Sequence, residues 1–212
     1  MKYLTVIIIS LMLAACGSGE TPEVRINSVA HSGDGCPMGT AGIILAEDKR
    51  SLSVTFDGNY EAIAGVGSGE NGGADVAVHR IACDIAVSLH IPAGYQAFLI
   101  GADYRGGVSL PVGAEAEFNR EYFFAGDRSS VLTQNWGNEF EDPSFVISDD
   151  LYAEADGGSI CGQDIIFRSN TSLYVTAPVD GDTALVQMDS FDYIHQQHRG
   201  SFIYEFAYAR CS

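Results

Sequence analysis

The sequence predicts an all-β protein, specifically an antiparallel β-sandwich that bears disulfides, with a β-barrel as the alternative. Three observations lead to this prediction. Apolar and polar residues alternate with the period of two expected for half-buried strands, glycine-rich turns separate these segments, with 24 Gly against 6 Pro, and no segment keeps a helical period. Many strands joined by turns, without helices between them, are typical of sandwiches and barrels.

The alternation is clearest in three segments, residues 51–56, 80–90 and 202–208. Each places bulky apolar residues on one face, and the third places four aromatic residues there and ends near Cys211. Further strands are expected at residues 24–30, 95–104, 116–124, 165–168, 173–177 and 184–188. Turns are expected at residues 65–73, 106–107, 157–158 and 180–182, where glycine is concentrated.

The least strand-like portion is residues 126–158, which contains Trp136 and a series of acidic residues. We expect it to be a long acidic excursion from the sheet. The acids are Glu139, Glu141, Asp142, Asp149, Asp150, Glu154 and Asp156. Because 46% of the residues are hydrophobic, there is enough apolar material for a core, and we predict a single β domain over residues 24–212.

The first fifteen residues have the features of a secretion signal. Lys2 precedes an apolar run over residues 4–13, and Leu13, Ala14 and Ala15 lead directly to Cys16. A membrane-spanning helix needs about 20 apolar residues, so this run is too short. We predict a lipoprotein signal peptide at residues 1–15, with Cys16 as the lipidated first residue of the mature protein. The alternative is an ordinary signal peptide in which the cysteine is coincidental.

Residues 16–23, which begin with the predicted lipidated Cys16, are mostly small and polar. We expect them to form a flexible tether between the lipid and the domain. The membrane would then be contacted through the lipid anchor only, because two or more acyl chains give stable anchoring. Gly17, rather than an aspartate, follows Cys16, and this favours the outer membrane of a bacterial envelope.

Four cysteines remain once Cys16 is assigned to lipid: Cys36, Cys83, Cys161 and Cys211. An exported protein meets an oxidising compartment, so two disulfides are expected, and four cysteines allow three connectivities. We predict Cys36 with Cys83 and Cys161 with Cys211, because each pair joins neighbours in the chain order and the bridges do not interleave. Zinc binding is not expected, since the close cysteine pairs of zinc sites are absent.

The formal net charge is -17. Such a surface repels phosphate, so nucleic acid is excluded as a partner, and anionic lipid head groups would not attract the domain either.

Several short motifs occur in an order and spacing that resembles the domain of unknown function 4360 family, which consists of secreted bacterial and fungal proteins. They are residues 35–40 around Cys36, residues 51–56, residues 80–84 around Cys83, residues 92–96, residues 103–107, residues 122–126 and the closing aromatic strand. The resemblance covers most of residues 24–211 and implies a compact extracytoplasmic β domain, but it implies no catalytic residues. The chain departs from the family pattern at the lipoprotein signal that ends in Cys16 and in the acidic region of residues 126–158. Within the matching motifs, Asp103 and Arg105 share a strand face and could form a structural ion pair or bind a ligand.

Catalytic motifs find little support. Gly67, Gly69 and Gly72 fit G-x-G-x-x-G, but no helix follows them, and no serine lies in G-x-S-x-G. His195 and His198 are not separated as in a zinc protease motif. Asn170 begins a glycosylation sequon, which is incidental in a bacterial protein. We therefore expect no catalytic residue, no metal and no cofactor.

Two classes of function stay open. The first is a non-catalytic module of the cell envelope that binds a cell-surface polymer or a protein partner. The second is an envelope glycan hydrolase that uses two of Glu139, Glu141, Asp149, Asp150 and Glu154 as paired carboxylates. A solvated loop accounts for these acids better than a calcium site, since no EF-hand pattern is present.

Overall fold

The computed structural model describes residues 21–57, 60–65, 67, 77–127, 130–137, 139–151, 158–178, 181–188, 191–192, 197–198 and 202–211. The predicted signal, Cys16 and most of the tether lie outside these residues. Within them every regular element is a strand, and no helix long and apolar enough to cross a membrane is found there.

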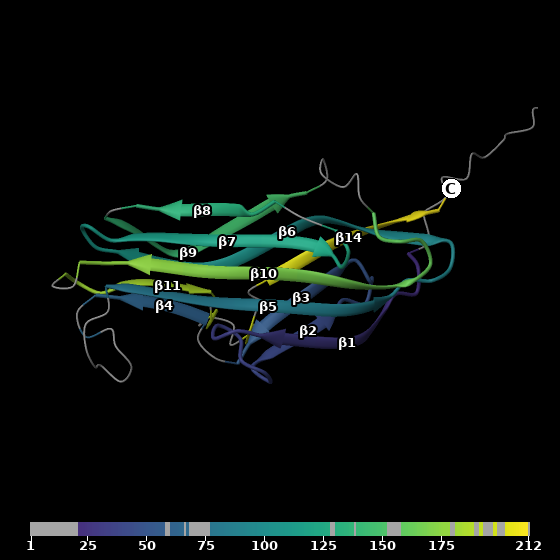
Figure 1. The fold of residues 1–212 in the computed structure, drawn as a ribbon, viewed down its shortest axis with the longest axis horizontal. Helices are drawn as coiled ribbons and strands as arrows, with labels where there is room; N and C mark the ends of the chain where they lie inside the picture. The colour runs from purple at the N-terminus through teal and green to yellow at the C-terminus, as the bar shows by residue number, and fades with distance from the viewer. Residues whose placement is uncertain are drawn as a thin grey trace, which may run out of the picture.

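Two antiparallel sheets face each other, and Figure 1 shows the five-stranded sheet in front. Its strand order is β1 (Arg25–Ser32), β5 (Val78–His90), β10 (Asp164–Thr176), β7 (Glu115–Phe124) and β8 (Leu132–Trp136). The seven-stranded sheet behind it has the order β2 (Ala41–Leu45), β3 (Ser51–Phe56), β14 (Phe202–Arg210), β6 (Tyr95–Leu110), β11 (Ala184–Met188) and β4 (Tyr60–Ala64), with β9 (Phe140–Asp150) paired to β6. Strands β12 (Phe191–Asp192) and β13 (Gln197–His198) form a small separate sheet. The prediction of an antiparallel sandwich is confirmed, and the sheets do not close into a barrel.

The core lies between the sheets and forms one cluster of buried residues. Its centre is aromatic: the Tyr104 ring packs against the rings of Phe118 and Phe202 at centroid distances of 5.1 and 4.7 Å. Phe167 and Phe206 extend this packing at 5.3 Å. Edge-to-face aromatic contacts of this kind stabilise a core beyond the area that they bury.

The structure contains two disulfides, Cys36–Cys83 and Cys161–Cys211. This is the pairing predicted from the order of the cysteines. The first joins the loop after β1 to the middle of β5. The second joins the segment before β10 to the residue after β14, so it links the two sheets at one end of the sandwich.

In its described part, the acidic region of residues 126–158 is not an excursion from the sheets, and that expectation was wrong. It contains β8, which pairs with β7, and β9, which pairs with β6, so one edge strand is added to each sheet. The Trp136 ring on β8 packs against Phe145 on β9 at a centroid distance of 5.0 Å. Edge strands are largely exposed on both faces, and for this reason their sequences lack a clear apolar alternation.

Two further expectations were wrong, one about the separation of two strands and one about a turn. The strands expected at residues 165–168 and 173–177 are parts of one long strand, β10, which ends at Thr176. The polar residues between the two halves are buried: Ser169 accepts a hydrogen bond from Tyr204, and Thr171 donates to the Cys83 carbonyl. The expected turn at Gly106 lies inside β6. There a Cβ atom would come within 2.2 Å of the Gln187 carbonyl oxygen on β11, so glycine permits the close pairing of the two strands.

Candidate functional site

The outer face of the five-stranded sheet carries polar side chains in straight rows. Residues directly opposite each other in antiparallel strands point to the same side, so the pairing of β5, β10 and β7 determines which outward side chains are neighbours. Three successive rows result, namely Arg80–Tyr174–Glu117, Ala82–Ser172–Asn119 and Asp84–Asn170–Glu121.

The middle row contains the short side chains of Ala82 and Ser172, and longer side chains flank it on both sides. A shallow hollow of about 420 Å³ results, which we call the trough. Val131, which is 57% exposed, borders it at the β8 side. An adjoining hollow of about 310 Å³ lies further along β7, between Tyr174 and Asn135.

Hydrogen bonds between neighbouring strands hold the polar side chains of the trough in place. Asn170 Nδ2 donates to Glu121 Oε2 at 3.0 Å, and Thr133 Oγ1 donates to Asn119 Oδ1 at 2.7 Å. The Asn119 amide in turn donates to Glu117. The side chains around the trough are therefore ordered before any ligand arrives, which lowers the entropic cost of binding.

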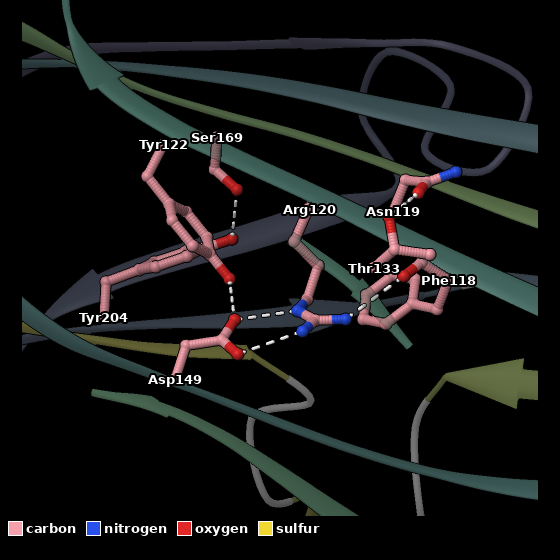
Figure 2. A network of polar contacts seen from close by, with 8 residues as sticks. All are labelled: Phe118, Asn119, Arg120, Tyr122, Thr133, Asp149, Ser169 and Tyr204. Atoms are coloured by element: carbon pink, nitrogen blue, oxygen red, sulfur yellow. Dashed lines mark hydrogen bonds and ion pairs between the residues drawn. The ribbon is translucent and has the colours of Figure 1, made fainter. Parts of the chain in front are cut away.

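The inner side of the same strands carries a buried ion pair that crosses between the sheets (Figure 2). Arg120 on β7 donates from Nε to Asp149 Oδ2 at 2.7 Å and from Nη2 to Asp149 Oδ1 at 2.9 Å. Its Nη1 donates to the Phe118 carbonyl at 3.1 Å. The side chains of Arg120 and Asp149 are only 5% and 9% exposed. Each charge offsets the desolvation cost of burying the other.

Tyr122 completes this network by donating from its hydroxyl to Asp149 Oδ2 at 2.5 Å. Burial lowers the pKa of Arg120, but the hydrogen bonds and the negative charge of Asp149 outweigh it, so that the net pKa is raised. Burial and the Asp149 carboxylate both raise the pKa of the Tyr122 hydroxyl. Both groups therefore remain protonated donors, and both oxygens of Asp149 are occupied.

Aromatic rings surround the guanidinium of Arg120. Its Cζ lies 5.1 Å from the ring centroid of Phe118 and 5.8 Å from that of Tyr104, which adds a cation–π contribution. The Tyr204 hydroxyl donates to Ser169 Oγ at 2.7 Å, and Figure 2 shows this bond beside the ion pair. The rings of Tyr122 and Tyr204 pack edge to face at a centroid distance of 6.2 Å, so these contacts together link β7, β9, β10 and β14 beneath the trough.

Of the carboxylates suggested for a hydrolase, Asp149 is engaged in the buried network and is not a free acid or base. Asp149 is held by Arg120 and Tyr122, and Asp150, its neighbour in β9, points to the opposite face of the strand. Glu139 immediately precedes β9, and Glu141 lies near the start of that strand. Glu154 lies outside the described residues.

The other candidate residues do not assemble a site either. Asp103 and Arg105 share the outer face of β6, but the two ion pairs found in the described part of the chain are Arg120–Asp149 and His90–Asp164. Gly69, Gly72 and His195 are not among the residues that the structure describes. Among the described residues, no group of three or more His, Cys, Asp or Glu is placed where it could hold a metal.

The trough was not predicted from the sequence. Its residues come from β5, β7 and β10, which are far apart in the chain, and Asn170 and Ser172 attracted notice only as part of a sequon. The sequence offered one signal, which is that polar residues alternate with apolar ones along each of these strands. Such alternation indicates a face in contact with solvent, but it does not show which residues of different strands become neighbours.

Comparison with known proteins now gives the family. Residues 22–211 match the family model described as "Domain of unknown function (DUF4360)". This chain belongs to the DUF4360 family. The predicted resemblance is therefore confirmed, and it extends over nearly the whole described sandwich.

A DUF4360 relative by sequence is an uncharacterized secreted protein of the fungus Arthroderma benhamiae, 27% identical over 179 residues, which cover 83% of this chain and 70% of the relative. Among solved structures, a family 11 carbohydrate-binding module from Clostridium thermocellum matches over 92% of this chain and 94% of the module, with 11% identity and a TM-score of 0.19. That superposition is too loose to bear on function.

Proposed function

We propose that this DUF4360 protein is a lipid-anchored, extracytoplasmic, non-catalytic module that binds a polymer of the cell envelope or cell surface through the trough. The secreted relative supports the extracytoplasmic location, as do the two disulfides, which persist in oxidising compartments. The trough carries the proposal, because it is a concave polar surface on an otherwise regular sheet face.

An open, shallow hollow suits an extended polymer better than a small substrate that must be enclosed. Small-molecule sites bury most of their ligand's surface, whereas the trough is open to solvent and continues toward a second hollow. Its rigid hydrogen-bonded side chains suit recognition of a repeating chain that passes over them.

The hydrolase alternative has one point in its favour, which is the placement of Asp84 and Glu121 on either side of Asn170. Inverting glycosidases hold two carboxyl groups about 6.5–9.5 Å apart. A general acid also needs a buried environment, and Asp84 is exposed. Binding without turnover is the better-supported function.

Filling the trough tests this function. Ala82→Ile places a bulky apolar side chain in the middle row, and isoleucine is favoured in strands, so the fold should survive. Ala86→Ile makes the same change on the same outward face of β5, beyond the trough. Both variants are made together with Cys16→Ser, so that the proposed lipid anchor does not itself retain the protein on the membrane. We expect the Ala82 variant to lose co-sedimentation with the insoluble envelope fraction of the producing bacterium, and the Ala86 variant to retain it. Equal binding by both variants would refute the trough as the binding surface, and release of reducing ends from that fraction would favour the hydrolase.

The lipid anchor is tested separately. Cys16→Ser removes the acceptor of the acyl chains, so the variant should move from the detergent phase to the aqueous phase in a phase-separation assay. Unchanged partitioning would show that Cys16 carries no lipid. Outer-membrane placement predicts that the wild-type protein fractionates with the outer membrane of a two-membrane envelope.

A further inference from the structure

We propose that the polymer bound in the trough is an uncharged, hydroxyl-rich glycan, which runs along β7 from the trough into the adjoining hollow and packs on the ring of Tyr174. This inference rests on the proposed function and specifies the chemical class of the ligand.

The two hollows lie in line along the outer face of β7. The trough is lined by Asn119 and Glu121, and the adjoining hollow is lined by Glu115 and Glu117. From residue 115 to residue 121 a strand advances by roughly 20 Å, at about 3.4 Å per residue. This length suits several sugar units of a linear chain, and the open ends of the path allow a longer polymer to continue beyond it.

The charges around the path disfavour an anionic ligand, and the carboxylates among them already accept hydrogen bonds from neighbouring amides. Arg80 is one cation beside the four carboxylates of Asp84, Glu115, Glu117 and Glu121, and the whole chain carries a net charge of -17. An anionic polymer would be repelled. A cationic polymer would be attracted by these carboxylates, but it would also meet Arg80 and would have to displace the amides of Asn119 and Asn170, which already donate to Glu117 and Glu121.

The polar groups instead match hydroxyls. A carboxylate offers about four acceptor sites on its two oxygens, and a hydroxyl both donates and accepts. Glu121 therefore keeps acceptor capacity after its bond from Asn170, and Arg80 can donate to a hydroxyl oxygen. Charge-assisted hydrogen bonds of this kind are about twice as strong as neutral ones, so an uncharged ligand can bind well to charged side chains.

Tyr174 provides the apolar contact that a sugar ring needs. It is 36% exposed at the centre of the sheet face, between Arg80 and Glu117, and it borders the adjoining hollow. An aromatic ring offers a large flat surface at low entropic cost. The apolar C–H face of a pyranose can pack on this ring while its equatorial hydroxyls reach the polar residues at the sides.

The test uses the mature protein on an array of uncharged oligosaccharides built from hexoses, pentoses and N-acetylhexosamines, with polygalacturonate and poly-L-lysine as charged probes. We expect binding to at least one uncharged glycan that persists in 0.5 M NaCl, because screening weakens ionic contacts and leaves neutral ones largely intact. Tyr174→Ala should weaken it by about tenfold, a factor equivalent to 1.4 kcal/mol, and Tyr174→Phe should keep it. Phe123→Ala, which truncates an aromatic residue on the outer face of β7 away from both hollows, is the control and should bind normally.

The outcomes separate this inference from the function on which it rests. Binding to a charged probe alone, or no binding to any uncharged glycan, overturns the glycan assignment, as does equal binding by the Tyr174→Ala and wild-type proteins. If Ala82→Ile still abolishes envelope binding in those cases, the binding function stands and the ligand belongs to another class. If Ala82→Ile has no effect, the proposed function itself fails.

Discussion

Removing the buried carboxylate of Asp149 should destabilise the sandwich severely. In Asp149→Ala, Arg120 loses both of its bonds at 2.7 and 2.9 Å and remains a cation at a site where its side chain is only 5% exposed. Breaking a buried ion pair in this way costs about 3–5 kcal/mol, because the remaining charge has no partner. Tyr122 also loses its acceptor, so the upper part of that range is expected.

The same physical argument predicts that removing both charges is far less harmful. Replacing a buried pair by apolar residues of similar size is often neutral, so Arg120→Met combined with Asp149→Leu should recover most of the lost stability. Tyr122→Phe, which removes one hydrogen bond and no charge, should cost about 1 kcal/mol.

Guanidinium chloride unfolding of the four proteins measures these differences. With a slope of about 4 kcal/mol/M, a loss of about 4 kcal/mol lowers the midpoint by roughly 1 M. A loss below about 1 kcal/mol for Asp149→Ala would refute the reasoning, and so would a double variant no more stable than the single one. Either result would mean that Arg120 reaches water or another partner in the variant.

Three further predictions follow from the structure. Replacing Cys36 and Cys83 together by alanine should cost about 4 kcal/mol, since the bridge closes a loop of 47 residues; thermal unfolding measures this, and an unchanged Tm would contradict it. Gly106→Ala should prevent normal pairing of β6 with β11, whereas Gly101→Ala, whose Cβ would lie 3.4 Å from its nearest neighbour, should be tolerated; circular dichroism melts of the two variants test the contrast. Burial raises the pKa of five tyrosines, which are Tyr60, Tyr104, Tyr122, Tyr204 and Tyr208. Because these raised pKa values favour the protonated tyrosines of the folded state, their contribution to folding stability is complete below about pH 10 and is lost as the pH rises above it. Absorbance at 295 nm should show these groups ionising together with unfolding. A smooth titration of all tyrosines near pH 10 in the folded protein would contradict the assignment.

The alternation of apolar and polar residues predicted the long central strands. It failed where polar residues are buried or where an edge strand is exposed on both faces. Residues 51–56 alternate because one face of β3 meets the core, and the strand has the predicted bounds. The two halves of β10 were separated because Ser169 and Thr171 interrupt the apolar pattern, although both are buried and hydrogen-bonded. Residues 140–150 were not recognised as a strand, since the edge strand β9 buries little of either face.

The amino-acid sequence by itself determined the fold class, the family and the set of cysteines that pair, because periodicity, motif order and residue type are properties of the linear chain. Only the tertiary structure decided which side chains became partners. Arg120 and Asp149 are separated by 29 residues and belong to different sheets, and Ala82, Ser172 and Asn119 form one row only through the register of three strands. A one-residue change of register would turn every side chain of a strand to its other face. The buried ion pair and the trough therefore depend on the pairing of whole strands, which no local segment encodes.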